Sequence, residues 1–138
     1  MIDRPIINGI PASQGPYVPV VRVDNLLFLS GQGPIDPKTN EFMLGSIEDQ
    51  THLVMENIGT ILSSCSASWA DIVKCSVFLA DANDFAAMNK VYATYFVDHK
   101  PTRTTIASIL VVPGMKVEID CIAYCPLSLR DKKATDVG

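Results

Sequence analysis

Apolar residues recur along this chain with two periods, one of about 3.6 residues and one of two residues, which predict its helices and strands. The helical period runs over residues 49–64, behind Ser46 as the N-cap, and again from Asn83 or Asp84 to about Val97. Both segments are therefore predicted to be amphipathic helices with one buried stripe. The apolar positions of these stripes are Val54, Ile58, Ile61 and Leu62 in the first helix, and Phe85, Met88, Tyr92 and Phe96 in the second.

Alternation of apolar and polar residues predicts the strands. Residues 17–24 and 26–30 are expected to form a hairpin, and residues 71–80 a half-buried strand. The β-branched run 102–106 after Pro101 and the strictly alternating run 116–124 predict the last two strands. Residues 41–44 are expected to form a further short strand.

This order of elements predicts one α+β domain over residues 1–138, with a core at about 5–126. The expected architecture is a mixed sheet of about six strands with two helices on one face. Because several strands carry apolar residues on both faces, we expect other subunits to bury the uncovered face. Residues 129–138 show no periodicity and are expected to be a flexible tail.

Two charged residues in the last two strands are candidates for chemistry. Arg103 lies inside the β-branched run, and Glu118 lies on the polar face of the final strand. If these strands are neighbours, the guanidinium and the carboxylate can face one cleft. The alternative is a structural ion pair at a subunit interface.

Composition narrows the function further. A net charge of −4 and a pI near 5.0 argue against a duplex-binding surface. The sequence has no apolar run of about 18 residues and no N-terminal targeting pattern, so we expect a cytoplasmic protein with reduced cysteines. The cysteines and histidines lack metal-ligand spacing, and residues 31–34 lack a phosphate-loop signature, so no metal or cofactor is expected. Those four residues are either a glycine-rich strand exit or backbone close to a ligand.

Short motifs in order along the chain resemble the RidA/YjgF/YER057c/UK114 family over about residues 5–126. Each motif alone is short, and the order and spacing of the set carry the resemblance. The motifs are Gly15-Pro16-Tyr17, Leu29-Ser30-Gly31-Gln32, Gln50-Thr51 with Asn57-Ile58, residues 71–79, Met88-Asn89 with Tyr92, Tyr95-Phe96, Pro101-Thr102-Arg103 and Val117-Glu118-Ile119.

The resemblance implies a chorismate-mutase-like fold and a homotrimer with active clefts between subunits. It implies hydrolysis of 2-imino acids, such as 2-iminobutanoate and 2-iminopropanoate, released by pyridoxal-phosphate-dependent dehydratases. The essential arginine of the family falls on Arg103 and its water-positioning glutamate on Glu118. The substrate-binding positions of the family fall on Tyr17, Ser30, Gly31, Asn89 and Thr105.

These residue types suit that chemistry. An arginine fork can grip the substrate carboxylate through two parallel hydrogen bonds, and a carboxylate can hold a water over the electrophilic C=N carbon. Tyr17 or Ser30 could donate to the leaving nitrogen or close the pocket. Two other functions stay open, namely a non-catalytic trimeric ligand-binding or chaperone-like protein, and an endoribonuclease or translation inhibitor.

Overall fold

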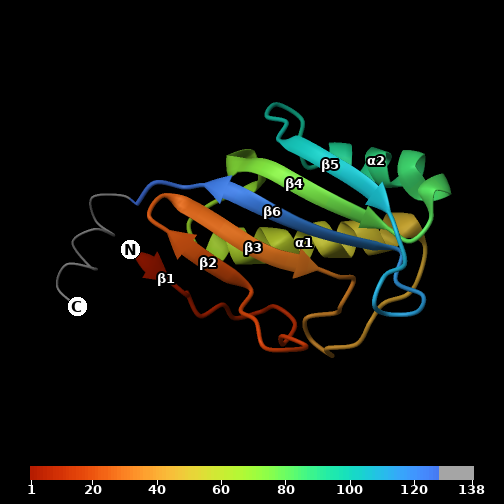
Figure 1. Cartoon of the computed structure of the whole chain (residues 1–138), viewed down its shortest axis with the longest axis horizontal. Helices are drawn as coiled ribbons and strands as arrows, with labels where there is room; N and C mark the ends of the chain where they lie inside the picture. The colour runs from red at the N-terminus through yellow and green to blue at the C-terminus, as the bar shows by residue number, and fades with distance from the viewer. Residues whose placement is uncertain (128–138) are drawn as a thin grey trace.

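The computed structural model describes residues 1–127, in which one six-stranded mixed sheet carries two α-helices (Figure 1). The strand order is β1-β2-β3-β6-β4-β5; β4 and β5 run parallel, and the other neighbours run antiparallel. The strands are β1 (Ile2–Asp3), β2 (Val20–Val23), β3 (Leu26–Gln32), β4 (Ile72–Leu79), β5 (Thr102–Ala107) and β6 (Val117–Tyr124), and the helices are α1 (Ile47–Ser64) and α2 (Phe85–Ala93).

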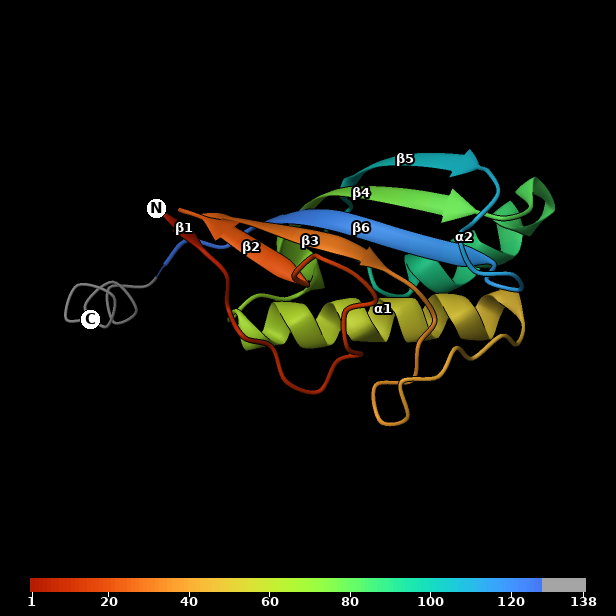
Figure 2. The same cartoon turned by 60° about the horizontal axis from the view of Figure 1, so that its bottom comes forward.

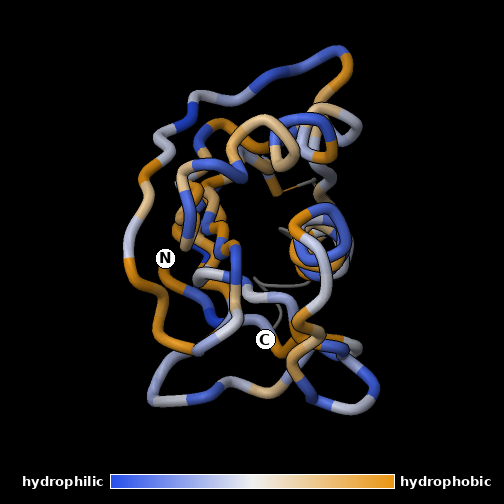
Figure 3. Tube along the Cα trace, turned by 90° about the vertical axis from the view of Figure 1, so that its right-hand side faces the viewer, coloured by the Kyte–Doolittle hydropathy of each residue, from blue (hydrophilic) through white to orange (hydrophobic). Residues whose placement is uncertain are grey.

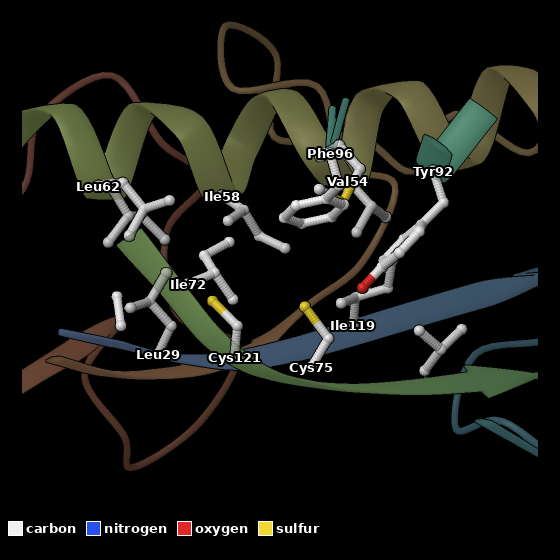
Figure 4. Close-up of a cluster of buried hydrophobic side chains, with 14 of the residues drawn as sticks. Leu29, Val54, Ile58, Leu62, Ile72, Cys75, Tyr92, Phe96, Ile119 and Cys121 are labelled. Atoms are coloured by element: carbon white, nitrogen blue, oxygen red, sulfur yellow. The ribbon is translucent and has the colours of Figure 1, made fainter. Parts of the chain in front are cut away.

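Both helices cover the same face of the sheet, as Figure 2 shows. The α1 stripe of Val54, Ile58, Ile61 and Leu62 is fully buried, as predicted. These side chains meet the inward residues of the central strands, including Cys75 and Cys121, in one core (Figure 4). Along the strands and helices, hydrophobic positions interleave with hydrophilic ones (Figure 3), because each element has one buried and one open face. The α+β class and the two-helix layer are thus confirmed.

The start of α1 is as predicted, and the end of α2 is not. Ser46 caps α1 by accepting a hydrogen bond from the Asp49 backbone N–H at 3.1 Å. The α2 helix ends at Ala93, not near Val97. The Thr94 hydroxyl donates to the Val91 carbonyl at 2.6 Å, and the next residues leave the helix so that Phe96 can pack into the core.

The strands differ from the predicted ones mainly at their ends. The β2 strand begins only at Val20, and residues 41–44 contribute a single bridge, from Phe42 to Ile35. The pairing of β4 with β6 shifts between Ile72 and Lys74, so that Ile72 is buried and Val73 is exposed. Strict alternation with the buried Cys75, Val77 and Leu79 would place Val73 on the inward face, but the bulge inserts one residue and reverses this. The predicted tail, residues 129–138, lies outside the described residues.

Among residues 1–127, no helix covers the opposite face of the sheet (Figure 2). Several large apolar side chains on this face are exposed. The exposed residues include Leu26, Phe28, Ile106 and Tyr124. Within the described chain, no helix is both long and apolar enough to cross a membrane.

Candidate active site

Four of the seven predicted site residues line one pocket on the uncovered side of the sheet. This pocket, of about 470 Å³, lies where β3 and β6 meet the connections that follow β3 and precede β6. Its polar lining includes Tyr17, Ser30 and Glu118, with Gly31 beside them. Apolar side chains form the remaining wall, and these are Ile35, Phe42, Val111, Val112 and Met115. We call it the Glu118 pocket.

Glu118 is half-buried in this pocket. It is paired in register with Phe78 on β4, on the face away from the helices. Burial raises the pKa of the Glu118 carboxyl group above its usual 4.5, and the nearby Asp120 carboxylate raises it further. A carboxylate with a raised pKa takes up a proton more readily, which suits a general base.

Tyr17 and Ser30 use their hydroxyl groups differently. The Ser30 hydroxyl donates to the Val18 carbonyl at 2.7 Å, so its proton is already engaged. The Tyr17 hydroxyl accepts a hydrogen bond from the Gln14 backbone N–H at 3.1 Å, and its own O–H is not used as a donor within residues 1–127. Of the two predicted donors, Tyr17 is therefore the one that can still donate to a ligand, while Ser30 can accept.

Arg103 lies elsewhere, on the edge strand β5. It is paired in register with the fully buried Cys75, so its side chain is on the face that carries the helices. There it lines a second pocket, of about 310 Å³, together with Asn89, Tyr92, Lys100 and Pro101. We call it the Arg103 pocket.

The surroundings of Arg103 leave its hydrogen-bonding groups free. Over residues 1–127, its guanidinium group has neither a hydrogen bond nor an ion pair. Two buried oxygens also lack hydrogen-bond partners in this part of the chain: Asn89 Oδ1, in the same pocket, and Thr105 Oγ1, two residues along the same face of β5. Buried polar groups are rarely left unpaired, so this cluster is suited to a polar ligand.

The hypothesis that Arg103 and Glu118 face one cleft of a single chain was wrong on two counts. Strand β4 lies between β5 and β6, so the two strands are not neighbours. The two side chains also lie on opposite faces of the sheet, since Arg103 shares a face with Cys75 and Glu118 does not. A single chain therefore divides the predicted residues into two groups: Tyr17, Ser30, Gly31 and Glu118 in one, and Asn89, Arg103 and Thr105 in the other.

Two aromatic residues that the sequence does not mark as site residues lie beside Arg103. The guanidinium carbon lies 4.8 Å from the centre of the Tyr92 ring and 5.5 Å from that of Phe85. Both residues had been interpreted only as members of the apolar stripe of α2. The available signal was their seven-residue spacing, which places them on one helix face, but nothing in the sequence relates that face to β5.

Neither pocket contains a recognisable metal site. Among residues 1–127, no three His, Cys, Asp or Glu side chains are grouped so as to hold a metal ion. The four cysteines are free and buried, and burial raises the pKa values of Cys65, Cys75 and Cys121. These three thiols therefore keep their protons and behave as small core residues.

Comparison with known proteins places the chain in a family. The profile of the Endoribonuclease L-PSP family matches residues 8–125. A RutC family protein of Pyrococcus horikoshii is 46% identical over 114 residues, which are 83% of this chain and 90% of that protein. The mouse 2-iminobutanoate/2-iminopropanoate deaminase is 35% identical over 113 residues, 82% of this chain and 84% of that protein.

A solved structure agrees with the sequence matches. The crystal structure of E. coli TdcF with bound serine aligns with a TM-score of 0.78 at 37% identity, covering 84% of this chain and 93% of that chain. The profile match spans most of the chain, and its relatives include reactive-intermediate and imine deaminases. The chain therefore belongs to the Endoribonuclease L-PSP family, the RidA/YjgF family that its motifs resemble.

Proposed function

We propose that this protein hydrolyses 2-imino acids, such as 2-iminobutanoate and 2-iminopropanoate, to 2-oxo acids and ammonia. The observation that carries the proposal concerns the guanidinium group of Arg103. Among residues 1–127 it has no hydrogen-bond or ion-pair partner, and it shares its pocket with the unpaired side-chain oxygen of Asn89. The mouse relative is named for this reaction, and the relative TdcF was crystallised with serine, whose carboxylate an arginine can bind.

In the proposed mechanism, Arg103 holds the substrate carboxylate through two parallel N–H···O bonds. This fork fixes both the position and the plane of the substrate, so that the C=N carbon faces the attacking water. Asn89, which lines the Arg103 pocket with an unpaired side-chain oxygen, and Thr105, on the same face of β5, supply further polar groups for the substrate.

Glu118 holds the water and takes its proton as the oxygen attacks C2. The C=N double bond becomes a single bond, and its nitrogen takes up a proton from solvent to give a tetrahedral amino alcohol. Glu118 then passes its proton to the nitrogen, and the C–N bond breaks as the C=O bond forms. Ammonia leaves, and the proton of the former hydroxyl group returns to solvent. The raised pKa of Glu118 favours the first of these transfers, the uptake of the proton from water.

This mechanism needs two copies of the chain, because one chain separates Arg103 from Glu118. We propose a homotrimer in which the uncovered sheet faces are buried, and in which the edge strand β5 of one copy brings its Arg103 pocket to the Glu118 pocket of the next. The exposed apolar side chains on that face support such packing. Closed rings of identical, head-to-tail contacts are the usual result of such an arrangement.

We also propose a source and a place for the substrate. Dehydratases that use pyridoxal phosphate release 2-imino acids, so they are the proposed upstream enzymes. The proposed compartment is the cytoplasm, a reducing environment in which the four free cysteines would stay reduced.

The test couples the purified protein to a threonine dehydratase, with semicarbazide present to trap free imine. The expected result is diversion of the imine from the trap to 2-oxobutanoate, lost in Arg103→Ala while the variant stays folded and oligomeric. Diversion that survives the substitution would move the site away from Arg103. If several 2-imino acids were all inert, the protein would instead be a ligand-binding member of the family.

A second test addresses the division of the site between copies. Arg103→Ala and Glu118→Gln chains with different tags are co-expressed, and mixed assemblies are purified through both tags in turn. Each variant alone should be inactive. In every mixed trimer, one cleft of the three joins an intact arginine to an intact glutamate, so about one third of wild-type activity is expected. Failure of mixed assemblies to regain activity would refute a site built from two copies.

A further inference from the structure

Two aromatic rings flank the Arg103 guanidinium group. Phe85 and Tyr92 are two helical turns apart on α2, so their Cα atoms are about 10 Å apart along the helix. The guanidinium carbon lies over both rings, 5.5 Å from the centre of the Phe85 ring and 4.8 Å from that of Tyr92. Figure 1 shows α2 running behind β5, which brings this helix face to the arginine.

We infer that Phe85 and Tyr92 are positioning residues that hold the Arg103 guanidinium group in place through their ring faces. This inference rests on the proposed function of Arg103 as the carboxylate clamp. The face of an aromatic ring attracts a cation, but it does not accept hydrogen bonds from the guanidinium N–H groups as a carboxylate does. The guanidinium group is thereby held in place while its five N–H donors stay available to a ligand.

The choice of aromatic residues has a physical reason. An acidic partner would hold Arg103 as firmly, but it would occupy the fork and compete with the substrate carboxylate. A purely aliphatic wall would leave the fork free but would supply no electrostatic attraction. The pKa of Tyr92 is raised by its burial and by the Cys75 thiol, so its ring stays neutral beside the arginine.

Phe85 is the better residue to test. Its side chain is 44% exposed, whereas Tyr92 is only 8% exposed and belongs to the core. Phe85→Leu keeps an apolar side chain but removes the ring face, and Phe85→Tyr keeps the ring. A cation–π contact at an exposed site corresponds to a factor of roughly two to five in an equilibrium constant.

The first measurement is independent of catalysis. Heteronuclear NMR relaxation reports the order of each arginine Nε–H group, and this chain supplies two references. Arg22 is buried with three hydrogen bonds to carbonyl oxygens, and Arg4 is exposed. We expect wild-type Arg103 to resemble Arg22, Phe85→Leu to shift it towards Arg4, and Phe85→Tyr to leave it unchanged.

The second measurement uses imine hydrolysis and binding of 2-oxobutanoate. Phe85→Leu should raise KM and the Kd of 2-oxobutanoate two- to fivefold, with kcat changed less than twofold. In an Arg103→Ala background the same substitution should have no further effect on 2-oxobutanoate binding. Phe85→Tyr should behave as the wild type.

The outcomes separate the inference from the proposed function. Unchanged order of Arg103 in Phe85→Leu would overturn the inference, and so would increased mobility with unchanged KM and Kd in an active enzyme. An equal loss of ligand binding in the Arg103→Ala background would also overturn it. An inactive wild type that shows the expected change in mobility would refute only the proposed function, because the rings would still be holding the arginine.

Discussion

Gly31 on β3 lies directly against the carboxyl group of Glu118 on β6. A Cβ atom added to Gly31 would lie 3.0 Å from both Cδ and Oε2 of Glu118. A side chain at position 31 would therefore displace the carboxylate by a few tenths of an ångström. The family resemblance marked Gly31 as a binding position without giving it a role, and this contact supplies a role.

Gly31→Ala is expected to displace the Glu118 carboxylate and to lower kcat/KM about tenfold, an effect of roughly 1.4 kcal/mol. The fold should tolerate the substitution, because the atoms that would collide belong to the end of a flexible side chain. Chemical denaturation should show a change in the free energy of unfolding below about 1 kcal/mol.

The matched control is Gly45→Ala. Its added Cβ would lie 3.6 Å from Asp49 Oδ2, an ordinary contact, and Gly45 lines neither pocket. This variant should retain full activity. Equal kinetics for the two alanine variants would mean that Gly31 does not determine the position of the Glu118 carboxylate.

The activity should depend on pH through Glu118. If Glu118 is the base, kcat/KM falls as this carboxyl group becomes protonated, with a midpoint above the usual 4.5. Asp120→Asn removes a neighbouring like charge and should move the midpoint to lower pH. Asp3→Asn makes the same charge change at the far edge of the sheet and should leave the midpoint in place.

The same shift has a consequence for stability with a definite sign. Because the pKa of Glu118 is raised in the fold, its protonated form favours folding. That contribution to stability is complete at pH values below the pKa of Glu118 in the unfolded chain, and it is lost as the pH rises through the pKa of Glu118 in the folded protein. The stability of Glu118→Gln relative to wild type should therefore increase from pH 4 to pH 7, as measured by urea unfolding at each pH. A constant difference would contradict the raised pKa.

Arg103→Lys keeps the positive charge but loses the planar fork. Charge-assisted hydrogen bonds contribute about 1.5–3 kcal/mol each, so losing one should lower kcat/KM by roughly ten- to a hundredfold. Steady-state kinetics would measure this loss, and circular dichroism would check that the variant is folded. Lys100→Arg, the reverse exchange in the same pocket, is the matched variant. Near-normal turnover of Arg103→Lys would refute the clamp.

A second glycine predicts a purely structural effect. Gly59 lies inside α1, and a Cβ at this position would overlap Cζ2 of Trp69, whose indole N–H donates to the Met55 carbonyl at 3.1 Å. Alanine favours helices by about 1 kcal/mol over glycine, yet Gly59→Ala should destabilise the protein by roughly 1–3 kcal/mol. Urea unfolding of this variant would be compared with that of Ser63→Ala, on the exposed side of α1. The comparison would separate the gain in helix propensity from the overlap with Trp69.

Local pattern was sufficient to predict most of the fold. The helical period fixed the buried stripe of α1, and alternation fixed the inward residues Val117, Ile119 and Cys121 of β6. The β1 strand was missed, because two residues carry no period and this strand exists only through its pairing with β2. The bulge near Val73 was missed for a similar reason, since it depends on the register of the partner strand.

The geometry of the site needed information that alternation does not contain. Alternation shows which residues of one strand share a face, as for Arg103 and Thr105, but not which face of the sheet the helices cover. It also leaves open the order of the strands, and here β4 lies between the two strands of interest. The placement of Arg103 and Glu118 on opposite faces follows only from the tertiary fold.

That opposite placement has a consequence for how activity would scale with the amount of protein. When a catalytic site is divided between copies, a dissociated chain has no activity at all, so dilution below the dissociation constant of the assembly removes turnover faster than it removes protein. At low abundance, the total rate of turnover would then rise more steeply than linearly with the amount of the chain that is expressed. A cell making little of this chain would have almost no imine hydrolysis from it, and modest induction would supply both halves of the site together.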